Sequence, residues 1–187
     1  MVHPDTYIST TTKGISLFAK RKFKKGEILW VADNTDTLIP LGSYLKLSKR
    51  EQEQLSHYCY LDGNKHIVIP GDNGKYVNHS CTPNCTYLIE FDNISVVMRD
   101  IEAGEEITEN YRCYYSHLSD FECKCGTKNC VGSLKKNDAF SPSLRLRLDD
   151  VVPLIRKHHQ PLLNRPFEGK KQFLTILNKE AYGYCGV

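Results

Sequence analysis

Short apolar runs separated by turn residues dominate the first hundred positions of the chain. Runs of about four to eight residues that are rich in β-branched and aromatic side chains, bounded by Gly, Pro, Asn or Asp, are typical of β-strands. The pattern predicts strands at 15–19, 27–31, 66–69, 87–91 and 94–98. Asp92-Asn93 lies between the last two runs, where a two-residue turn would join them as a hairpin. We therefore expect a mainly β fold.

Helical signals are confined to one internal segment and to the carboxyl-terminal part. Ser48, followed three residues later by Glu51, has the spacing of a capping box, which predicts a helix within 48–61. Amphipathic stretches at 149–159 and 168–182 predict further helices, so the β core is expected to carry a helical appendage. The basic residues of this appendage are expected to form a solvated face. They are Arg145, Arg147, Arg156, Lys157, Lys170 and Lys171.

Composition is that of a folded globular protein. Of the 187 residues, 40% are hydrophobic and 25% are charged, which excludes the low-apolar, high-charge regime of disorder. The formal net charge of +3 is too small to indicate a nucleic-acid-binding surface. No apolar run is long enough to span a membrane, and the amino terminus lacks the pattern of a secretory signal. We therefore expect an intracellular protein with one functional core and neither membrane nor nucleic acid as a necessary partner.

A cluster of cysteines indicates a metal site. Three of the eight cysteines lie close together, at Cys123, Cys125 and Cys130, and Gly126 supplies the backbone freedom that a tight turn around an ion requires. Structural zinc takes four ligands, so a fourth must come from elsewhere. Reduced thiols without a metal are the alternative. Spacing does not choose among the cysteine candidates for the fourth ligand, which are Cys81, Cys85, Cys113 and Cys185.

Four motifs of the chain resemble those of a known family and occur in the same order. The segment at 76–85, Tyr-Val-Asn-His-Ser-Cys-Thr-Pro-Asn-Cys, resembles the Asn-His-Ser-Cys-x-Pro-Asn signature of SET-domain lysine methyltransferases. Gly-Glu-Glu-Ile-Thr-Glu-Asn-Tyr at 104–111 is similar to the family's Gly-Glu-Glu-Leu-Thr-x-Asp-Tyr element. The segment at 13–19, with the turn at 25–27, resembles its Gly-x-Gly-Leu-Phe-Ala strand, and 122–130 is similar to its zinc-binding post-SET segment.

The resemblance implies a SET-type fold of small curved sheets with a threaded segment, or pseudoknot. The threaded segment would carry Asn78-His79, and the loop around it would be formed by the strand that carries Tyr111. Residue 78 would then lie beside residue 111. The implied organisation is a SET domain at 1–116, a post-SET zinc-binding segment at 117–134 and the helical carboxyl-terminal extension at 135–187.

The resemblance also implies an S-adenosylmethionine-dependent protein-lysine N-methyltransferase. A histone tail lysine is the favoured acceptor, with a ribosomal or other cytosolic lysine as the alternative; the acceptor protein and the oligomeric state are left open. The expected compartment is the nucleus in a eukaryote and the cytoplasm otherwise. Tyr58 is a candidate for the cofactor pocket, with a core position as an equal alternative. The other residues implied to hold the cofactor are Gly14, Ile15, Asn78, His79 and Lys124.

Tyr111 is implied to align the methyl transfer. Its hydroxyl can accept weak C–H hydrogen bonds from the polarised methyl group while it steers the amine. Glu109 stands where many members have an aromatic residue in the lysine channel. Because a carboxylate there would stabilise a charged amine, we expect Glu109 to point away and Tyr87 to supply the channel hydroxyl. This arrangement predicts a mainly monomethylating enzyme.

The resemblance to the SET-domain family implies which cysteine is the fourth zinc ligand. The implied set is Cys81, Cys123, Cys125 and Cys130. Departures from the family's pattern at Ser16, Glu109 and Asn110 keep a second hypothesis open, a non-catalytic SET-like module that binds the cofactor or a peptide. A third hypothesis, a zinc-stabilised interaction protein without a cofactor, leaves three of the four motifs unexplained.

Overall fold

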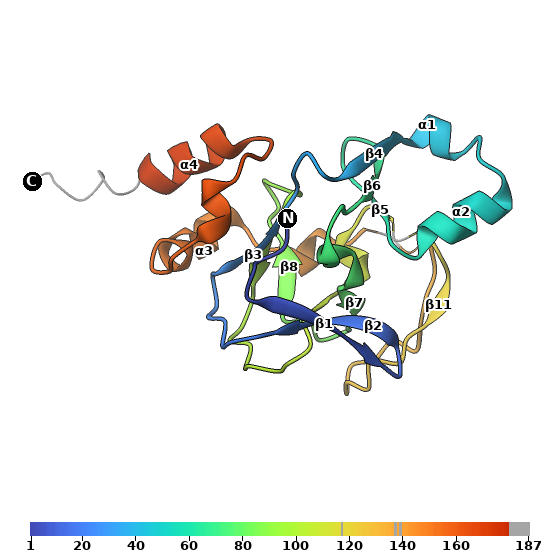
Figure 1. Ribbon diagram of the computed structural model, residues 1–187, viewed down its shortest axis with the longest axis horizontal. Coiled ribbons are helices and arrows are strands. Elements are labelled where there is room, and N and C mark those ends of the chain that lie inside the picture. Colours follow the sequence, from blue (N-terminus) through green and yellow to red (C-terminus); the bar gives the residue numbers. More distant parts are fainter. Residues whose placement is uncertain (117, 137, 139, 180–187) are drawn as a thin grey trace, which may run out of the picture.

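The strands form five small sheets of two or three short strands each in the described part of the chain (Figure 1). The computed structural model describes residues 1–116, 118–136, 138 and 140–179. Its strands are β1 (Thr6–Thr11), β2 (Gly14–Ala19), β3 (Ile28–Val31), β4 (Thr37–Pro40), β5 (Tyr60–Leu61), β6 (His66–Ile69), β7 (Asn78–His79), β8 (Cys85–Tyr87), β9 (Ile94–Val97), β10 (Thr108–Glu109), β11 (Phe121–Glu122) and β12 (Ser133–Leu134). They pair as β1-β2, β3-β9-β8, β4-β6-β5, β7-β10 and β11-β12, which confirms the expected mainly β fold of small sheets.

Helices lie on opposite sides of these sheets, α1 (Leu41–Tyr44) and α2 (Lys49–Ser56) on one side and α3 (Leu148–Ile155) and α4 (Lys170–Lys179) on the other (Figure 1). The predicted capping box is present, because Ser48 Oγ accepts from the Glu51 N–H and the Glu51 carboxylate accepts from the Ser48 N–H. α2 ends before residue 61, since Tyr60–Leu61 pairs with β6 as β5. Short 3₁₀ helices are η1 (Asn73–Tyr76), η2 (Tyr111–Cys113), η3 (Pro142–Leu144) and η4 (Pro161–Asn164). The predicted helix at 168–182 corresponds to α4, and its last residues, from 180, lie outside the described residues.

The connection after β8 departs from the predicted hairpin. β8 ends at Tyr87, and several residues separate it from β9, so the two-residue hairpin is wrong, although Asp92-Asn93 does form the turn that leads into β9. The cause is a competing partner, since the Glu90 carboxylate accepts from the Leu148 N–H at 2.8 Å. The residues after Tyr87 therefore join the carboxyl-terminal extension instead of continuing the strand.

A parallel pair joins two segments that lie far apart in the sequence. β7 and β10 pair with Asn78 opposite Thr108 and His79 opposite Glu109. Just beyond β10, the Tyr111 N–H donates to Nδ1 of His79 at 3.1 Å. This is the contact that a threaded arrangement requires, and it brings the two central motifs together.

The described part of the carboxyl-terminal extension contains the predicted helices, and its apolar residues belong to the core. Gln160 ties it to β3, because its side-chain oxygen accepts from the Ile28 N–H at 2.8 Å. Arg145 is buried and donates to the Cys113 carbonyl at 2.8 Å, so its assignment to a solvated face is wrong; the other basic residues of that set are exposed or half-buried. The apolar cluster between the extension and the sheet contains Ile28, Val31, Phe91, Val96, Val152, Ile155 and Phe173.

Gly26 provides a test of this packing. Its φ is +92°, and a Cβ there would meet the Cβ of Leu154 in α3 at 2.5 Å. Gly104 has a φ of +80° but open space around a Cβ. We expect Gly26→Ala to lower the free energy of unfolding by about 1–3 kcal/mol more than Gly104→Ala, because both strain the backbone and the first also overpacks α3. Chemical denaturation measures the difference, and equal losses would contradict tight packing of α3 on Gly26.

Candidate active site and metal centre

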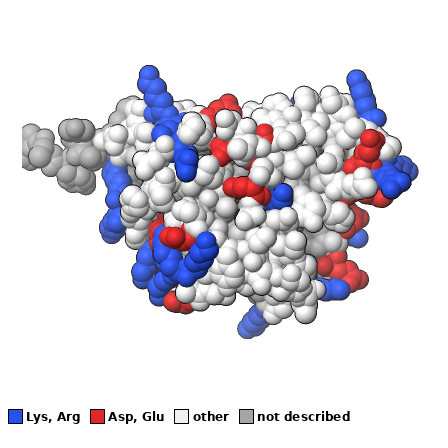
Figure 2. Space-filling view, viewed as in Figure 1, with Lys and Arg blue, Asp and Glu red and all other residues white. Residues whose placement is uncertain are grey.

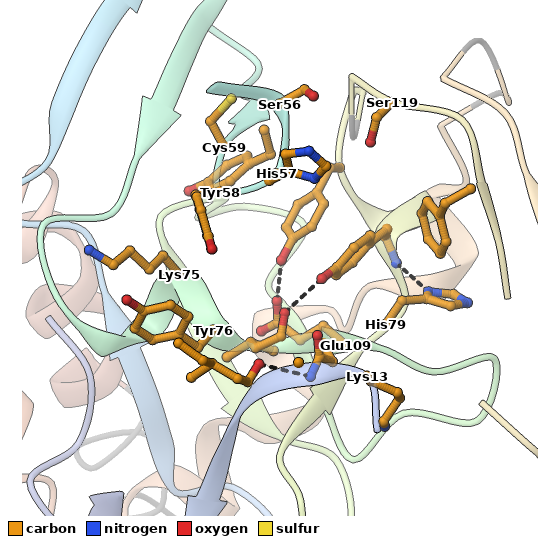
Figure 3. A pocket seen from close by; sticks show the side chains of 18 of the residues that line it. Lys13, Ser56, His57, Tyr58, Cys59, Lys75, Tyr76, His79, Glu109 and Ser119 are labelled. Atoms are coloured by element: carbon orange, nitrogen blue, oxygen red, sulfur yellow. Dashed lines mark hydrogen bonds between the residues drawn. The ribbon is translucent and has the colours of Figure 1, made fainter. Parts of the chain in front are cut away.

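A cavity of about 730 Å³ opens between the β1-β2 turn and strands β5, β7, β10 and β11 (Figure 3). Its volume lies in the range of cofactor sites. Its walls contain the residues that were predicted from the sequence to bind the cofactor or to line the substrate channel. These are Gly14, Ile15, Tyr58, Asn78, His79, Tyr87, Glu109, Tyr111 and Lys124. The fold thus gathers residues that are spread over more than a hundred positions of the sequence.

Asn78 holds the rim of the cavity at the β1-β2 turn. Its side-chain N–H groups donate to Ser16 Oγ at 2.7 Å, to the Glu106 carboxylate at 3.1 Å and to the Ile15 carbonyl at 3.3 Å. The Glu106 carboxylate also pairs with Lys13. Burial opposes the charge of Glu106, but the hydrogen bonds from Lys13 and Asn78 hold its pKa below the usual value. Asn78 therefore ties the turn to β7.

Two of the departures from the family's pattern have structural roles. Ser16 is fully buried, accepts from Asn78 and is not among the described residues that line the cavity, so its side chain does not narrow the cavity. Asn110 caps η2, because its side-chain oxygen accepts from the Arg112 N–H at 3.1 Å. Neither substitution removes a functional group from the cavity wall.

Tyr111 is held at the start of η2 with its ring edge-on to His79 and Phe121. Its hydroxyl donates to the Val77 carbonyl at 2.8 Å. Burial raises the pKa of Tyr111, so the phenol stays protonated and keeps this hydrogen bond. Because its proton is directed to Val77, the hydroxyl oxygen can act toward the cavity as an acceptor.

A cage of tyrosines forms the buried end of the cavity. Tyr60 and Tyr114 stack with ring centroids 4.5 Å apart. Tyr87 lies 6.0 Å from Tyr60 and 5.4 Å from Tyr114, and Tyr111 lies 5.7 Å from Tyr114. Burial raises the pKa of all these phenols, so they are neutral. Tyr60 and Tyr114 were not predicted from the sequence. The available signal was their position close to two predicted site residues, since Tyr60 follows Tyr58 and Tyr114 follows Tyr111 by a few residues.

Glu109 faces inward, in the wall of the tyrosine cage (Figure 3). Its side chain is buried, and its oxygens accept from Ser95 Oγ at 2.5 Å and from the Tyr114 hydroxyl. The expectation that Glu109 points away from the channel is therefore wrong, because these hydroxyls provide polar partners that the local sequence does not display. Burial raises the pKa of Glu109, against the lowering effect of both hydrogen bonds.

The outer part of the cavity suits the cofactor that the resemblance implies. Tyr58 is 46% exposed and packs edge-on to Tyr76, which places it at the mouth and not in the core (Figure 3). Lys75 and Lys124 also line the cavity. At Gly14, a Cβ would meet no atom within 4 Å, so the wall is open to a ligand there. S-adenosylmethionine has an adenine and a carboxylate, which fit aromatic rings and lysine ammonium groups respectively.

Four cysteine sulfurs converge beside this cavity, all within 4.8 Å of one another. They belong to Cys81, Cys123, Cys125 and Cys130. Cys81 follows β7, whereas the others lie between β11 and β12, where Gly126 makes the expected turn with a φ of +69°. Cys85 and Cys113 are buried outside this cluster, and Cys185 lies outside the described residues.

The geometry of the cysteine cluster suits zinc. Tetrahedral Zn–S bonds of about 2.3 Å place sulfurs about 3.8 Å apart, and the sulfurs of Cys81 and Cys123 are separated by 3.8 Å. His79 Nε2 lies 3.3 Å from Cys81 Sγ. Since His79 Nδ1 accepts from the Tyr111 N–H, Nε2 carries the proton and donates to the sulfur. One imidazole therefore links a candidate metal ligand to the backbone of Tyr111.

Surface charge is mixed on the face shown in Figure 2, where acidic and basic side chains are interspersed and much of the face is uncharged. Ion pairs such as Lys24 with Asp100 and Arg99 with Glu105 neutralise part of the basic surface. This distribution agrees with the small net charge. Within the described part of the chain, no helix combines the length and apolarity needed to cross a membrane.

Comparison with known proteins gives consistent matches. The SET domain family matches residues 14–112. The chain is 32% identical, over 95% of its length, to the variant-silencing SET domain-containing protein of Plasmodium falciparum, of which it covers 8%. It is 31% identical, over 71% of its length, to the histone-lysine N-methyltransferase NSD3 of Mus musculus, of which it covers 10%. An H3 lysine-36 specific histone-lysine N-methyltransferase of Aspergillus oryzae is 26% identical over 67% of the chain and is covered to 14%. The chain thus spans a small part of the length of these relatives.

Proposed function

This chain belongs to the SET-domain family, and we propose from that premise that it is an S-adenosylmethionine-dependent protein-lysine N-methyltransferase. The observation that carries the proposal is the tyrosine cage, which shares one cavity with the rim held by Asn78. Neutral aromatic rings suit the alkyl chain of a lysine, and the rim suits the methyl donor. The relatives named as histone-lysine N-methyltransferases support the same activity.

The residues on the donor side of the cavity would bind the methyl donor and orient it. S-adenosylmethionine supplies an electrophilic methyl group on a sulfonium. The β1-β2 turn, held by Asn78, would fix the position of the donor, while Tyr58 and Lys124 would close over it from the mouth. The residues proposed to hold it are Gly14, Ile15, Tyr58, Asn78, His79 and Lys124.

The tyrosine cage would receive the acceptor lysine. Removal of the amine from water favours its neutral form, which is the nucleophile. The Tyr111 hydroxyl, oriented by its hydrogen bond to Val77, would accept C–H contacts from the methyl group and keep the amine in line. Orientation of this kind contributes about 7–11 kcal/mol in well-aligned reactions.

The cysteine cluster is proposed to hold a structural zinc ion as a post-SET site. Through Cys81 the ion would fasten the β11-β12 loop to the core. Phe121 of β11 and Lys124 of this loop are part of the cavity wall, so the ion would shape the cavity without taking part in the reaction. The proposed division is a SET domain at 1–116 and a post-SET segment at 117–134, followed by the extension at 135–187, whose described residues include several that pack onto the core.

A histone tail lysine is the proposed acceptor, because relatives over much of this chain are named as histone-lysine N-methyltransferases. The nucleus is the corresponding compartment if the source is a eukaryote. A lysine of a ribosomal or other cytosolic protein is the second candidate for the acceptor. The small net charge of +3 favours recognition of a peptide segment in the cavity over binding to nucleic acid.

Transfer of a labelled methyl group tests the proposed function. The chain is incubated with radiolabelled S-adenosylmethionine and with core histones or a cell extract, and label is expected in a histone lysine. Label in other proteins of the extract, with none in histones, would reject the histone assignment and retain the activity. Calorimetric binding of the cofactor without any transfer would support the non-catalytic module instead, and absence of cofactor binding would support the interaction protein.

Tyr87 should control how many methyl groups are added. Its ring is 4% exposed and faces Tyr60 and Tyr114 in the cage. Without its hydroxyl, the cage has more room for a methylated amine and one less hydrogen-bonding group to hold the unmethylated one, so Tyr87→Phe should shift products from monomethyllysine toward di- and trimethyllysine. Mass spectrometry of a peptide after exhaustive reaction measures the distribution.

Tyr7→Phe is the matched control for Tyr87→Phe. Tyr7 lies on β1, is 38% exposed and is not among the described residues that line the cavity. Its variant should give the wild-type products. Trimethyllysine as the main wild-type product, or an unchanged distribution in Tyr87→Phe, would reject the role of Tyr87.

A further inference from the structure

Among the described residues, Glu109 is a buried carboxylate without an ion-pair partner. Its exposed fraction is 3%, and its oxygens accept from two neutral hydroxyls, those of Ser95 and Tyr114. The guanidinium of Arg145 is close enough to lower the pKa of Glu109, but it donates its hydrogen bond to the Cys113 carbonyl and not to Glu109. Burial of a carboxylate without a cation is unfavourable, and such groups are concentrated at functional sites.

The tyrosines and thiols around Glu109 are neutral. Burial raises the pKa of every tyrosine in the cage and of both nearby thiols, so they keep their protons at neutral pH. The set consists of Tyr60, Tyr87, Tyr111, Tyr114, Cys85 and Cys113, with Arg145 as the charged neighbour. His79, which lies opposite Glu109 in the β7-β10 pair, accepts from the Tyr111 N–H at Nδ1 and directs Nε2 to Cys81 Sγ. Within the described part of the cage, Glu109 is therefore the group that can accept a proton from a ligand in the cavity.

We infer that Glu109 is the general base that accepts a proton from the ammonium group of the acceptor lysine before methyl transfer. This inference rests on the proposed function and deepens it. Glu109 ends β10, and Tyr111, two residues later, begins η2. Both line the same cavity, so an amine aligned by Tyr111 would lie beside the carboxylate. Burial raises the pKa of Glu109 toward the range in which a base works best at neutral pH.

The proton and the electron pairs balance without a further reactant. One N–H bond of the ammonium breaks, and its proton passes to an oxygen of Glu109, which leaves a neutral amine. The lone pair of this amine forms the new N–C bond while the S–C bond of the donor breaks and its electron pair stays on sulfur. The methylated amine leaves as a cation, and Glu109 returns its proton to water through the mouth of the cavity.

Glu109→Gln separates a base from a structural residue, because Gln has nearly the same size but does not accept the proton. In this variant, only lysine that is already neutral can react. We expect kcat/KM to be about 100-fold lower near pH 7 and to rise about tenfold per pH unit toward the lysine pKa of about 10.4. For the wild type, kcat/KM should change little with pH above the acid limb of its pH profile. A peptide with a lysine analogue of lower amine pKa should recover most of the loss, whereas a loss that is equal at every pH and for both peptides would overturn the inference.

Ser95→Ala perturbs Glu109 without removing it. The hydrogen bond from Ser95 lowers the pKa of Glu109, so its loss raises that pKa. Because the base must be deprotonated, the acid limb of the pH profile should then move to higher pH, and an unmoved limb would contradict the inference. Glu102→Gln is the matched control, since Glu102 is an exposed carboxylate that pairs with Lys22 and is not among the described residues lining the cavity. Thermal melting of each variant verifies that it is folded.

A measurement without turnover distinguishes failure of this inference from failure of the proposed function. Infrared difference spectra of wild type minus Glu109→Gln record the C=O band of the protonated carboxyl during a pH titration. With n-butylamine as the probe, an ammonium in the cage favours the charged carboxylate, so the midpoint of this band should fall. A midpoint that does not respond overturns the assignment of Glu109. A response in a protein that methylates no acceptor supports the amine site and contradicts the proposed function.

Discussion

Replacement of Tyr111 by Phe should lower kcat by about 100-fold or more, because loss of alignment in the transition state has an effect of that order. The dissociation constant for S-adenosylmethionine should change little. The hydroxyl is the group that is lost, whereas the ring keeps its contacts with His79 and Phe121. An interaction made mainly in the transition state lowers kcat and kcat/KM together. Single-turnover kinetics and calorimetry with the cofactor measure the two quantities separately.

Tyr44→Phe is the matched control for Tyr111→Phe. Tyr44 is also buried, and its hydroxyl donates to the Gln52 carbonyl; neither residue is among the described residues that line the cavity. Its variant should keep the wild-type kcat and lose about 1 kcal/mol of stability, the usual contribution of such a hydrogen bond. Near wild-type turnover in Tyr111→Phe, or a loss that is explained by weaker cofactor binding, would reject the assigned role of Tyr111.

Loss of one cysteine ligand should release the metal ion and abolish methyl transfer. Elemental analysis is expected to find one zinc ion per chain, bound with the affinity of structural sites, for which binding free energies are about 10–16 kcal/mol. Ser does not replace a thiolate well, so Cys81→Ser or Cys125→Ser should lose the ion. β11 and the loop that follows it would then no longer be fastened to the core, and Phe121 and Lys124 would leave the cavity wall. Zinc content and methyl transfer should therefore fall together.

Cys85→Ser and Cys113→Ser are the matched controls for the metal site. Both thiols are buried outside the cysteine cluster, so they are not placed to bind an ion held by its four sulfurs. Their variants should retain zinc. Release of zinc from either control, with retention in Cys81→Ser, would show that the assigned ligand set is wrong.

Features that depend on near neighbours could be predicted from the sequence. The cap of α2 depends on Ser48 and Glu51, and the turn in the cysteine loop depends on Gly126, so each could be inferred from a few adjacent residues. The meeting of His79 with Tyr111 is different in kind, because no periodicity relates residues so far apart. The resemblance to a family supplied that information.

Features that depend on distant partners could not be predicted. Glu109 turns inward because Ser95 on β9 and the Tyr114 hydroxyl are there to donate to it. Arg145 is buried because the Cys113 carbonyl accepts from its guanidinium. The pattern of polar and apolar residues predicts which type of side chain is usually buried. It does not show which distant residue will bind a buried polar group, because that partner is brought close by the fold.

The carboxyl-terminal extension determines how short a fragment of this protein can be and still fold. α3 and α4 cover an apolar face that includes Phe91 and Val96, and Arg145 lies 5.9 Å from the ring centroid of Tyr87 in the cage. A fragment that ended at residue 112, where the family match ends, would leave that face in water, where exposed apolar patches promote association. The unit that folds is therefore longer than the segment by which the family is recognised.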